Sequence, residues 1–166
     1  ATIGAGKELS LIIRAGAGVN AIDLAKASEF GIHVTNSPGR NTEAVAELAI
    51  GLLIAADRRI ADATADLRGG KWRKKEYGKA AGLKGRTLGI LGVGSIGKAV
   101  VQRAKALEMN VVAWSRSLTP EKAKELGVGF CATPADVAKV ADAISLHLAA
   151  KPETKKMINA EFIALL

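Results

Sequence analysis

The sequence predicts an α/β fold in which helices cover both faces of a doubly wound parallel sheet. Three observations lead to this prediction. Short apolar runs alternate along the chain with stretches of helical periodicity, which is the order that βαβ units require. Of the 166 residues, 49% are hydrophobic and only 4% are aromatic, so we expect a core of small and branched side chains that lets helices approach a sheet closely. A glycine-rich turn also separates one apolar run from the helix that follows it.

The first half of the chain predicts a mixed set of elements. Before residue 40 these are a buried strand over 9–13, a helix capped by Asn20 and ending at Phe30, a strand over 32–35 and a turn over 37–39. A long helix begins at Thr42 and ends near Arg58, and because it is apolar on nearly every side, we expect it to be buried between layers. A second helical stretch reaches Leu67. The Gly- and Lys-rich segment 68–85 is long for an irregular connection, which indicates a functional or subunit-contact loop.

The second half is more regular. It predicts strands over 87–91, 110–114 and 143–148, and helices over 95–108, 120–126, 133–140 and from 160 onward. Strands that alternate with helices imply parallel pairing with right-handed crossovers.

Composition and charge exclude several classes of function. A single cysteine, Cys131, excludes an internal disulfide framework and is typical of a reducing cytoplasm. No leader segment is recognised, and the most apolar stretch, 44–56, contains Glu47 and is too short to span a bilayer, so we expect no membrane partner. The residues suggest no metal site. The net charge of +8 indicates either attraction of anions or a solvated surface.

A local basic cluster also carries two aromatic residues. It comprises Lys71, Arg73, Lys74, Lys75 and Lys79, with Trp72 and Tyr77 among them. Basic and aromatic residues together can bind nucleic acid, but no nucleic-acid motif accompanies them. We therefore expect no nucleic-acid partner and a loop that Trp72 anchors.

The glycine-rich turn is the strongest motif. Gly92-Val93-Gly94-Ser95-Ile96-Gly97 matches G-x-G-x-x-G directly after a predicted strand and at the start of a helix, which is the context of a dinucleotide-binding βαβ unit of the Rossmann type. Gly92 would make the tight turn, Gly94 would let a pyrophosphate approach, and Gly97 would let the helix pack on the strand. Ser95 and Ile96 would offer helix N–H groups to the phosphates. The alternative is a tight turn without a ligand.

The end of the next strand leaves the choice of nicotinamide cofactor open. An acidic residue there would hold the ribose hydroxyls of NAD, but the sequence has Ser115 followed by Arg116. A hydroxyl and a guanidinium accept a 2′-phosphate, which favours NADP or both cofactors. Alternatively, Arg116 stacks on the adenine while NAD binds.

Several stretches together resemble the D-isomer-specific 2-hydroxyacid dehydrogenases. They are 13–20 with Ile22-Asp23, 31–39, Asn41 with 45–47, 70–72, 83–90, the turn at 92–97, and 145–148. Their order and spacing cover nearly the whole chain. The resemblance implies that residues 1–40 are the C-terminal part of a flavodoxin-like substrate domain, and that 41–166 are an incomplete dinucleotide-binding domain.

The resemblance also implies roles for individual residues. The loop formed by Arg14, Ala15, Gly16, Ala17 and Gly18 would bind the carboxylate of a small 2-hydroxy or 2-oxo acid, with Asn41 at the hinge near it. His147 and Leu148 would border the cofactor, although the chain continues Ala149-Ala150 where the family commonly has a proline. Segment 57–85 would be the contact of a homodimer or a higher homo-oligomer, with Arg73–Lys75 near the neighbouring subunit's substrate.

The family's catalytic Arg, Glu and His have no counterpart in this chain, whose two histidines, His33 and His147, lie outside the catalytic motif. We therefore expect part of a larger dehydrogenase, inactive as 166 residues. The favoured substrate is 3-phospho-D-glycerate, at the entry to serine biosynthesis. The alternatives are a glyoxylate or hydroxypyruvate reductase, and a non-catalytic NAD(H)-sensing module of the corepressor kind.

Overall fold

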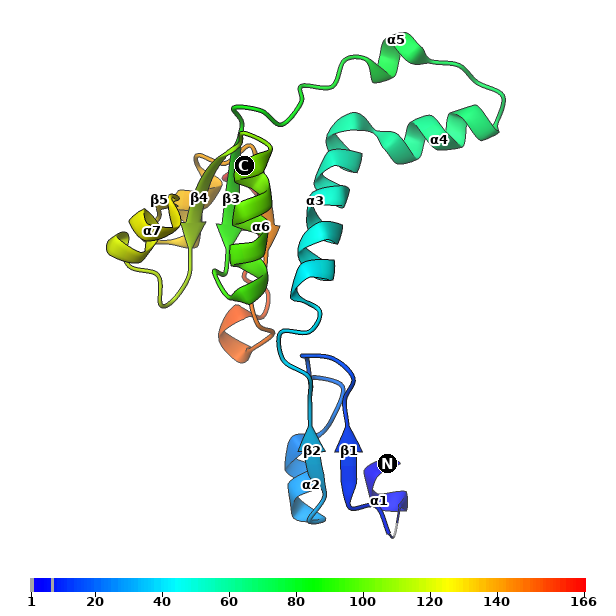
Figure 1. Ribbon diagram of the computed structural model, residues 1–166, viewed down its shortest axis with the longest axis vertical. Helices are drawn as coiled ribbons and strands as arrows, with labels where there is room; N and C mark the ends of the chain where they lie inside the picture. Colours follow the sequence, from blue (N-terminus) through cyan, green and yellow to red (C-terminus); the bar gives the residue numbers. More distant parts are fainter. Residues whose placement is uncertain (1, 7) are drawn as a thin grey trace. The chain divides into compact units, whose positions relative to one another are not determined.

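A computed structural model describes residues 2–6 and 8–166 (Figure 1). The chain divides into two compact units, residues 1–43 and 44–166. Each unit contains one sheet, and every strand pair in both sheets is parallel. Helices connect the strands, so the predicted α/β fold with parallel sheets is confirmed.

The first unit is small. Its elements are α1 (Thr2–Ala5), β1 (Leu11–Ile13), α2 (Leu24–Glu29) and β2 (His33–Thr35), and β1 pairs with β2. The predicted helix cap at Asn20 was wrong: α2 begins later, where the carboxylate of Asp23 accepts a hydrogen bond from the Lys26 amide. The predicted burial of the first strand was also wrong, since Leu11 and Ile13 are exposed. A sheet of two strands offers those side chains no second layer among the described residues.

The second unit contains a four-stranded sheet in the order β5-β4-β3-β6. The strands are β3 (Thr87–Leu91), β4 (Asn110–Trp114), β5 (Gly129–Phe130) and β6 (Ala143–Leu146). The predicted bounds of β3 and β4 are confirmed, whereas the sequence analysis missed β5, which has only two residues. The central strand β3 is almost fully buried, as expected for a parallel strand covered on both faces.

Helices cover the sheet on both faces. They are α6 (Ser95–Ala106), α7 (Pro120–Leu126), α8 (Pro134–Ala138) and α9 (Ala160–Ile163), with a short 3₁₀ turn η1 (Pro152–Thr154) after β6. Leu88 and Ile90 of β3 belong to one core cluster with the inner residues of α6. Their neighbours face the other way: a Cβ added at Gly89 would overlap Val137 of α8, and Leu91 packs with that helix and α9. This alternation along β3 makes the sheet doubly wound.

Helix α3 (Thr42–Arg58) packs on the same core as α6. Ala46 is fully buried there, and Ala49, Ile50 and Leu53 contact the cluster. The prediction that α3 is buried between layers was wrong for its other side, where the side chains of Leu48 and Leu52 are 62% and 61% exposed. Only one layer of described residues packs on this helix.

Two short helices follow α3. Arg59 precedes helix α4 (Ile60–Arg68) as its N-cap residue, and α5 (Lys74–Tyr77) lies inside the segment predicted to be irregular. The phenol of Tyr77 donates a hydrogen bond of 2.5 Å to Asp66, and the Arg59 guanidinium lies 5.0 Å from the centre of the Tyr77 ring. Trp72 does not anchor this segment as predicted, because its side chain is 77% exposed.

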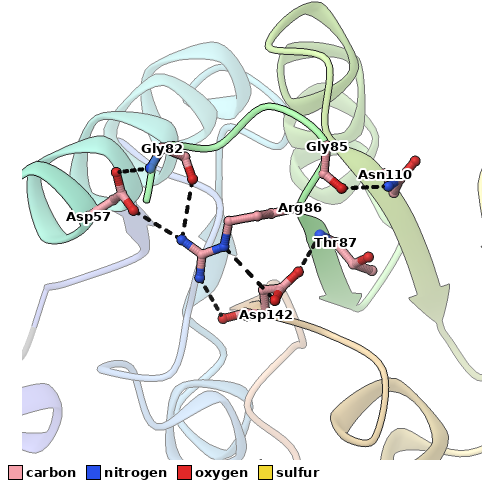
Figure 2. A network of polar contacts seen from close by, with 7 residues as sticks. All are labelled: Asp57, Gly82, Gly85, Arg86, Thr87, Asn110 and Asp142. Atoms are coloured by element: carbon pink, nitrogen blue, oxygen red, sulfur yellow. Dashed lines mark hydrogen bonds and ion pairs between the residues drawn. The ribbon is translucent and has the colours of Figure 1, made fainter. Parts of the chain in front are cut away.

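A polar network holds the amino end of the sheet (Figure 2). Its centre is Arg86, whose guanidinium donates to the Asp57 carboxylate (3.0 Å) at the end of α3 and to the carbonyls of Gly82 and Asp142. Asp57 also accepts from the Gly82 amide (3.1 Å), and Asp142 accepts from the Thr87 amide (2.7 Å). The network therefore joins α3, the segment before β3 and the start of β6.

Candidate functional site

The glycine-rich turn lies at the carboxyl end of β3. Gly92 has a φ of +102°, and a Cβ there would lie 2.6 Å from the carbonyl oxygen of His147. A Cβ at Gly97 would overlap the carbonyl oxygen of Gly92. Both positions therefore require glycine: the first for a left-handed turn in a crowded space, the second for close packing of α6 on the turn.

Gly94 differs from the other two glycines. Its backbone is extended, it caps α6, and nothing lies within 4 Å of an added Cβ. No side chain caps the helix, so the first amides of α6, those of Ser95 and Ile96 among them, point into this space. An open cradle bounded by free N–H groups and a positive helix end fits the pyrophosphate of a dinucleotide.

The end of β4 borders a hollow beside this turn. Ser115 is partly buried and Arg116 is exposed. The hollow has a volume of about 270 Å³ and is lined by Val93, Lys98, Ser115, Ser117, Leu118, Lys122, Glu125 and Leu126. The sequence analysis missed Lys98 and Lys122. A signal existed for Lys98, which directly follows the last glycine of the motif.

His147 and Leu148 follow β6 at the same edge of the sheet. The His147 amide donates to the carbonyl of Leu91 (2.8 Å), and the carbonyl of His147 lies next to Gly92. Its imidazole turns away and lines an apolar hollow of about 460 Å³ between α3 and β6, with Nε2 2.8 Å from the Ser145 hydroxyl. Burial lowers the pKa of His147, which favours the neutral ring. Leu148 packs against the core cluster of Leu91.

The predicted carboxylate-binding loop belongs to the first unit, as does Asn41 in the turn before α3. Asn36 holds the loop by donating to the Ala17 carbonyl (2.9 Å), and the Gly16 amide donates to Arg14. Within the described part of the chain, the amides of Ala17 and Gly18 donate to no other group. The Arg14 side chain donates to the Ala15 carbonyl and forms no ion pair with a described residue.

The basic cluster near α5 is partly neutralised. Arg73 lies 3.3 Å from Asp66 and 3.6 Å from Glu76, so its charge is engaged within the chain. Arg73 also lines an apolar hollow of about 580 Å³, together with Ile60, Leu67 and Trp72.

The described residues contain neither a metal-binding cluster nor a membrane-spanning helix. Across 2–6 and 8–166, no three His, Cys, Asp or Glu side chains are grouped closely enough to hold a metal ion. Over the same residues, no helix has the length and apolar character to cross a membrane.

Residues 50–166 match the family model of the D-isomer specific 2-hydroxyacid dehydrogenase NAD binding domain. The chain belongs to this family. Its second unit is therefore an NAD-binding domain of the Rossmann type, and the expected family membership is confirmed.

Similar proteins support this membership. The chain is 42% identical over 160 residues to a D-3-phosphoglycerate dehydrogenase of Methanocaldococcus jannaschii. The matched region covers 96% of this chain and 30% of that protein. It is 44% identical over 162 residues to a hydroxypyruvate reductase of Thermotoga maritima, covering 98% and 51%. A Granulicella formate dehydrogenase has a similar structure, with a TM-score of 0.88 at 30% identity, covering 99% of this chain and 44% of that one. The chain thus spans between 30% and 51% of the length of these proteins.

Proposed function

We propose that this chain is the cofactor-binding part of a dehydrogenase that oxidises 3-phospho-D-glycerate in serine biosynthesis. The observation that carries the proposal is the turn at 92–97 in a chain of this family. Of the three glycines in this turn, Gly94 has open space beside it, whereas Gly92 and Gly97 are closely packed. The 42% identity to a D-3-phosphoglycerate dehydrogenase supports the choice of substrate.

The chain's own residues would bind and orient the two reactants. The turn at 92–97 would hold the pyrophosphate, and Ser115, Arg116, His147 and Leu148 would border the rest of the cofactor. The free amides of Ala17 and Gly18, with Arg14 and Asn41, would hold the substrate carboxylate. When bound, the nicotinamide accepts the hydride from C2 of the substrate. The acid/base that takes the hydroxyl proton would come from sequence outside this chain.

A second candidate of the same class is a glyoxylate or hydroxypyruvate reductase. The 44% identity to a hydroxypyruvate reductase favours it. Ser115 and Arg116 at the end of β4 also support it, because a hydroxyl and a guanidinium can accept the 2′-phosphate of NADP. NAD and NADP therefore both stand as cofactors.

We further propose that the protein is a cytoplasmic homodimer that associates through residues 57–85. Ile60, Leu67 and Trp72 expose large apolar side chains around one hollow there, and an exposed apolar patch of this kind is typical of a subunit contact. Because Arg73 is paired with Asp66 and Glu76, Lys74 and Lys75 are the better candidates to approach a neighbouring subunit's substrate.

The test is a comparison of kcat/KM for 3-phospho-D-glycerate, hydroxypyruvate and glyoxylate on the complete protein, with both cofactors. The highest kcat/KM for 3-phospho-D-glycerate is expected. A higher value for hydroxypyruvate or glyoxylate selects the reductase. Binding of NADH without turnover of any of the three favours a non-catalytic sensing module.

A further inference from the structure

We propose that Lys98 and Lys122 select the phosphorylated cofactor, NADP(H), by binding its adenosine 2′-phosphate. The inference rests on the proposed function, since it assumes that a dinucleotide binds at the 92–97 turn. It adds two residues and a direction of preference that the motif alone does not provide.

The two lysines come from different elements and line one hollow. Lys98 lies one turn into α6, and Lys122 lies in the first turn of α7. Between them, Ser115 and Ser117 follow the end of β4, and Val93 of the glycine turn forms another wall. In a dinucleotide fold the adenosine ribose lies beside the end of the second strand, which here is β4. The hollow is therefore placed where a group on the ribose 2′ oxygen would lie.

The chemistry of the lining favours a phosphate over a free hydroxyl. A 2′-phosphate carries close to two negative charges at neutral pH, and two ammonium groups with two hydroxyls can neutralise and hydrogen-bond it. The position where a carboxylate would hold the ribose hydroxyls is Ser115, so this position does not repel a phosphate. Arg116 is exposed next to it and adds a third positive charge.

One carboxylate lines the same hollow and defines the competing arrangement. Glu125 lies three residues after Lys122 on α7. If Glu125 instead held the ribose hydroxyls, NADH would bind better than NADPH, and the lysines would be surface charges without a ligand. The two arrangements predict opposite effects when Glu125 loses its charge.

The experiment is a calorimetric titration of the chain with NADPH, NADH, 2′,5′-ADP and ADP at one low ionic strength. It uses the unchanged chain and the variants Lys98→Gln, Lys122→Gln and Glu125→Gln. Lys124→Gln is the matched control, because Lys124 is an exposed lysine on the same helix that does not line the hollow. Circular dichroism checks that each variant is folded.

We expect NADPH to bind at least tenfold more tightly than NADH, and 2′,5′-ADP more tightly than ADP. Each lysine substitution should weaken NADPH binding about tenfold, which corresponds to one charge-assisted contact, and leave NADH within about threefold. Lys124→Gln should change neither, and Glu125→Gln should strengthen NADPH binding.

Four results would overturn the inference. The inference is wrong if NADH binds more tightly than NADPH. It is also wrong if the Lys98 and Lys122 variants lose no more NADPH affinity than Lys124→Gln does. Either result leaves the proposed function unaffected. Weaker NADH binding in Glu125→Gln would assign the hollow to the competing arrangement. Failure of every nucleotide to bind would overturn both the inference and the proposed function.

Discussion

Replacing Arg86 by Met should destabilise the second unit by about 2–3 kcal/mol. The substitution keeps much of the side chain's apolar length but removes the guanidinium that pairs with Asp57 at 3.0 Å. The Asp57 side chain is only 7% exposed, so its carboxylate would remain buried, with the Gly82 amide as its one remaining donor among the described residues. Removing one partner of a fully buried ion pair costs about 3–5 kcal/mol. Arg86 is 33% exposed, and water can replace part of the lost contact, so we expect a smaller loss.

The matched control is Lys84→Met, two residues earlier. Lys84 pairs with Glu108 at 2.7 Å, but the two side chains are 75% and 65% exposed. Exposed pairs contribute about 0–1 kcal/mol because water screens both charges. The shorter distance belongs to the weaker pair, so burial and not distance decides the ranking.

The assay is urea unfolding followed by circular dichroism, with thermal unfolding as a second measurement. For a chain of this size, about 2 kcal/mol corresponds to a fall of roughly 4–8 °C in Tm. A double-mutant cycle with Asp57→Asn separates the Arg86–Asp57 coupling from the contacts of Arg86 with the two carbonyls. The reasoning is refuted if Arg86→Met costs no more than Lys84→Met, or if the cycle shows no coupling.

Three further predictions concern the site. Gly97→Ala should lower the free energy of unfolding by about 1–3 kcal/mol, because its Cβ would overlap the Gly92 carbonyl oxygen. Gly94→Ala should change the free energy of unfolding by no more than about 0.5 kcal/mol but weaken cofactor binding about tenfold or more. Urea unfolding and calorimetry distinguish the two effects. Burial lowers the pKa of His147 in the folded chain, so as the pH falls the unfolded chain binds this proton before the folded chain does. The contribution of the neutral His147 to the free energy of unfolding is therefore present above pH about 6.5 and is lost as the pH falls below that value. Urea midpoints at pH 7.5 and 5.5 should therefore differ less in His147→Asn, while His33→Gln, an exposed control, should keep the difference. The 166-residue chain should bind cofactor but not oxidise 3-phospho-D-glycerate, and any such oxidation measured by NAD(P)H absorbance contradicts the assignment of the acid/base to other sequence.

The sequence predicted the central strands well because their signal is local. β3 and β4 are continuous apolar runs between turn residues, and both strand bounds were confirmed. β5 was missed because two residues, Gly129 and Phe130, are too short to show any period. The helix cap was placed at Asn20 since Asn and Asp are equally good caps, and only the structure shows that Asp23 accepts the amide bond.

Tertiary packing explains the other differences. Apolar periodicity showed that α3 has an apolar outer face, but it could not show that no described layer covers Leu48 and Leu52. The glycine pattern predicted where a dinucleotide would approach. It could not predict Lys98 and Lys122, because their hollow forms only where α6, the end of β4 and α7 meet. The domain division and the roles of the individual site residues stay predictions.

The two ends of β3 have different roles. The Arg86 network holds its amino end, and the glycine turn begins at its carboxyl end, five strand residues away, or about 16 Å. Stabilising substitutions often reduce activity where the active site needs flexibility or a strained conformation. Here, substitutions that strengthen the amino end do not touch the groups that would hold the cofactor. We therefore expect substitutions at the amino end of β3 to change the free energy of unfolding of this domain without changing the glycine turn.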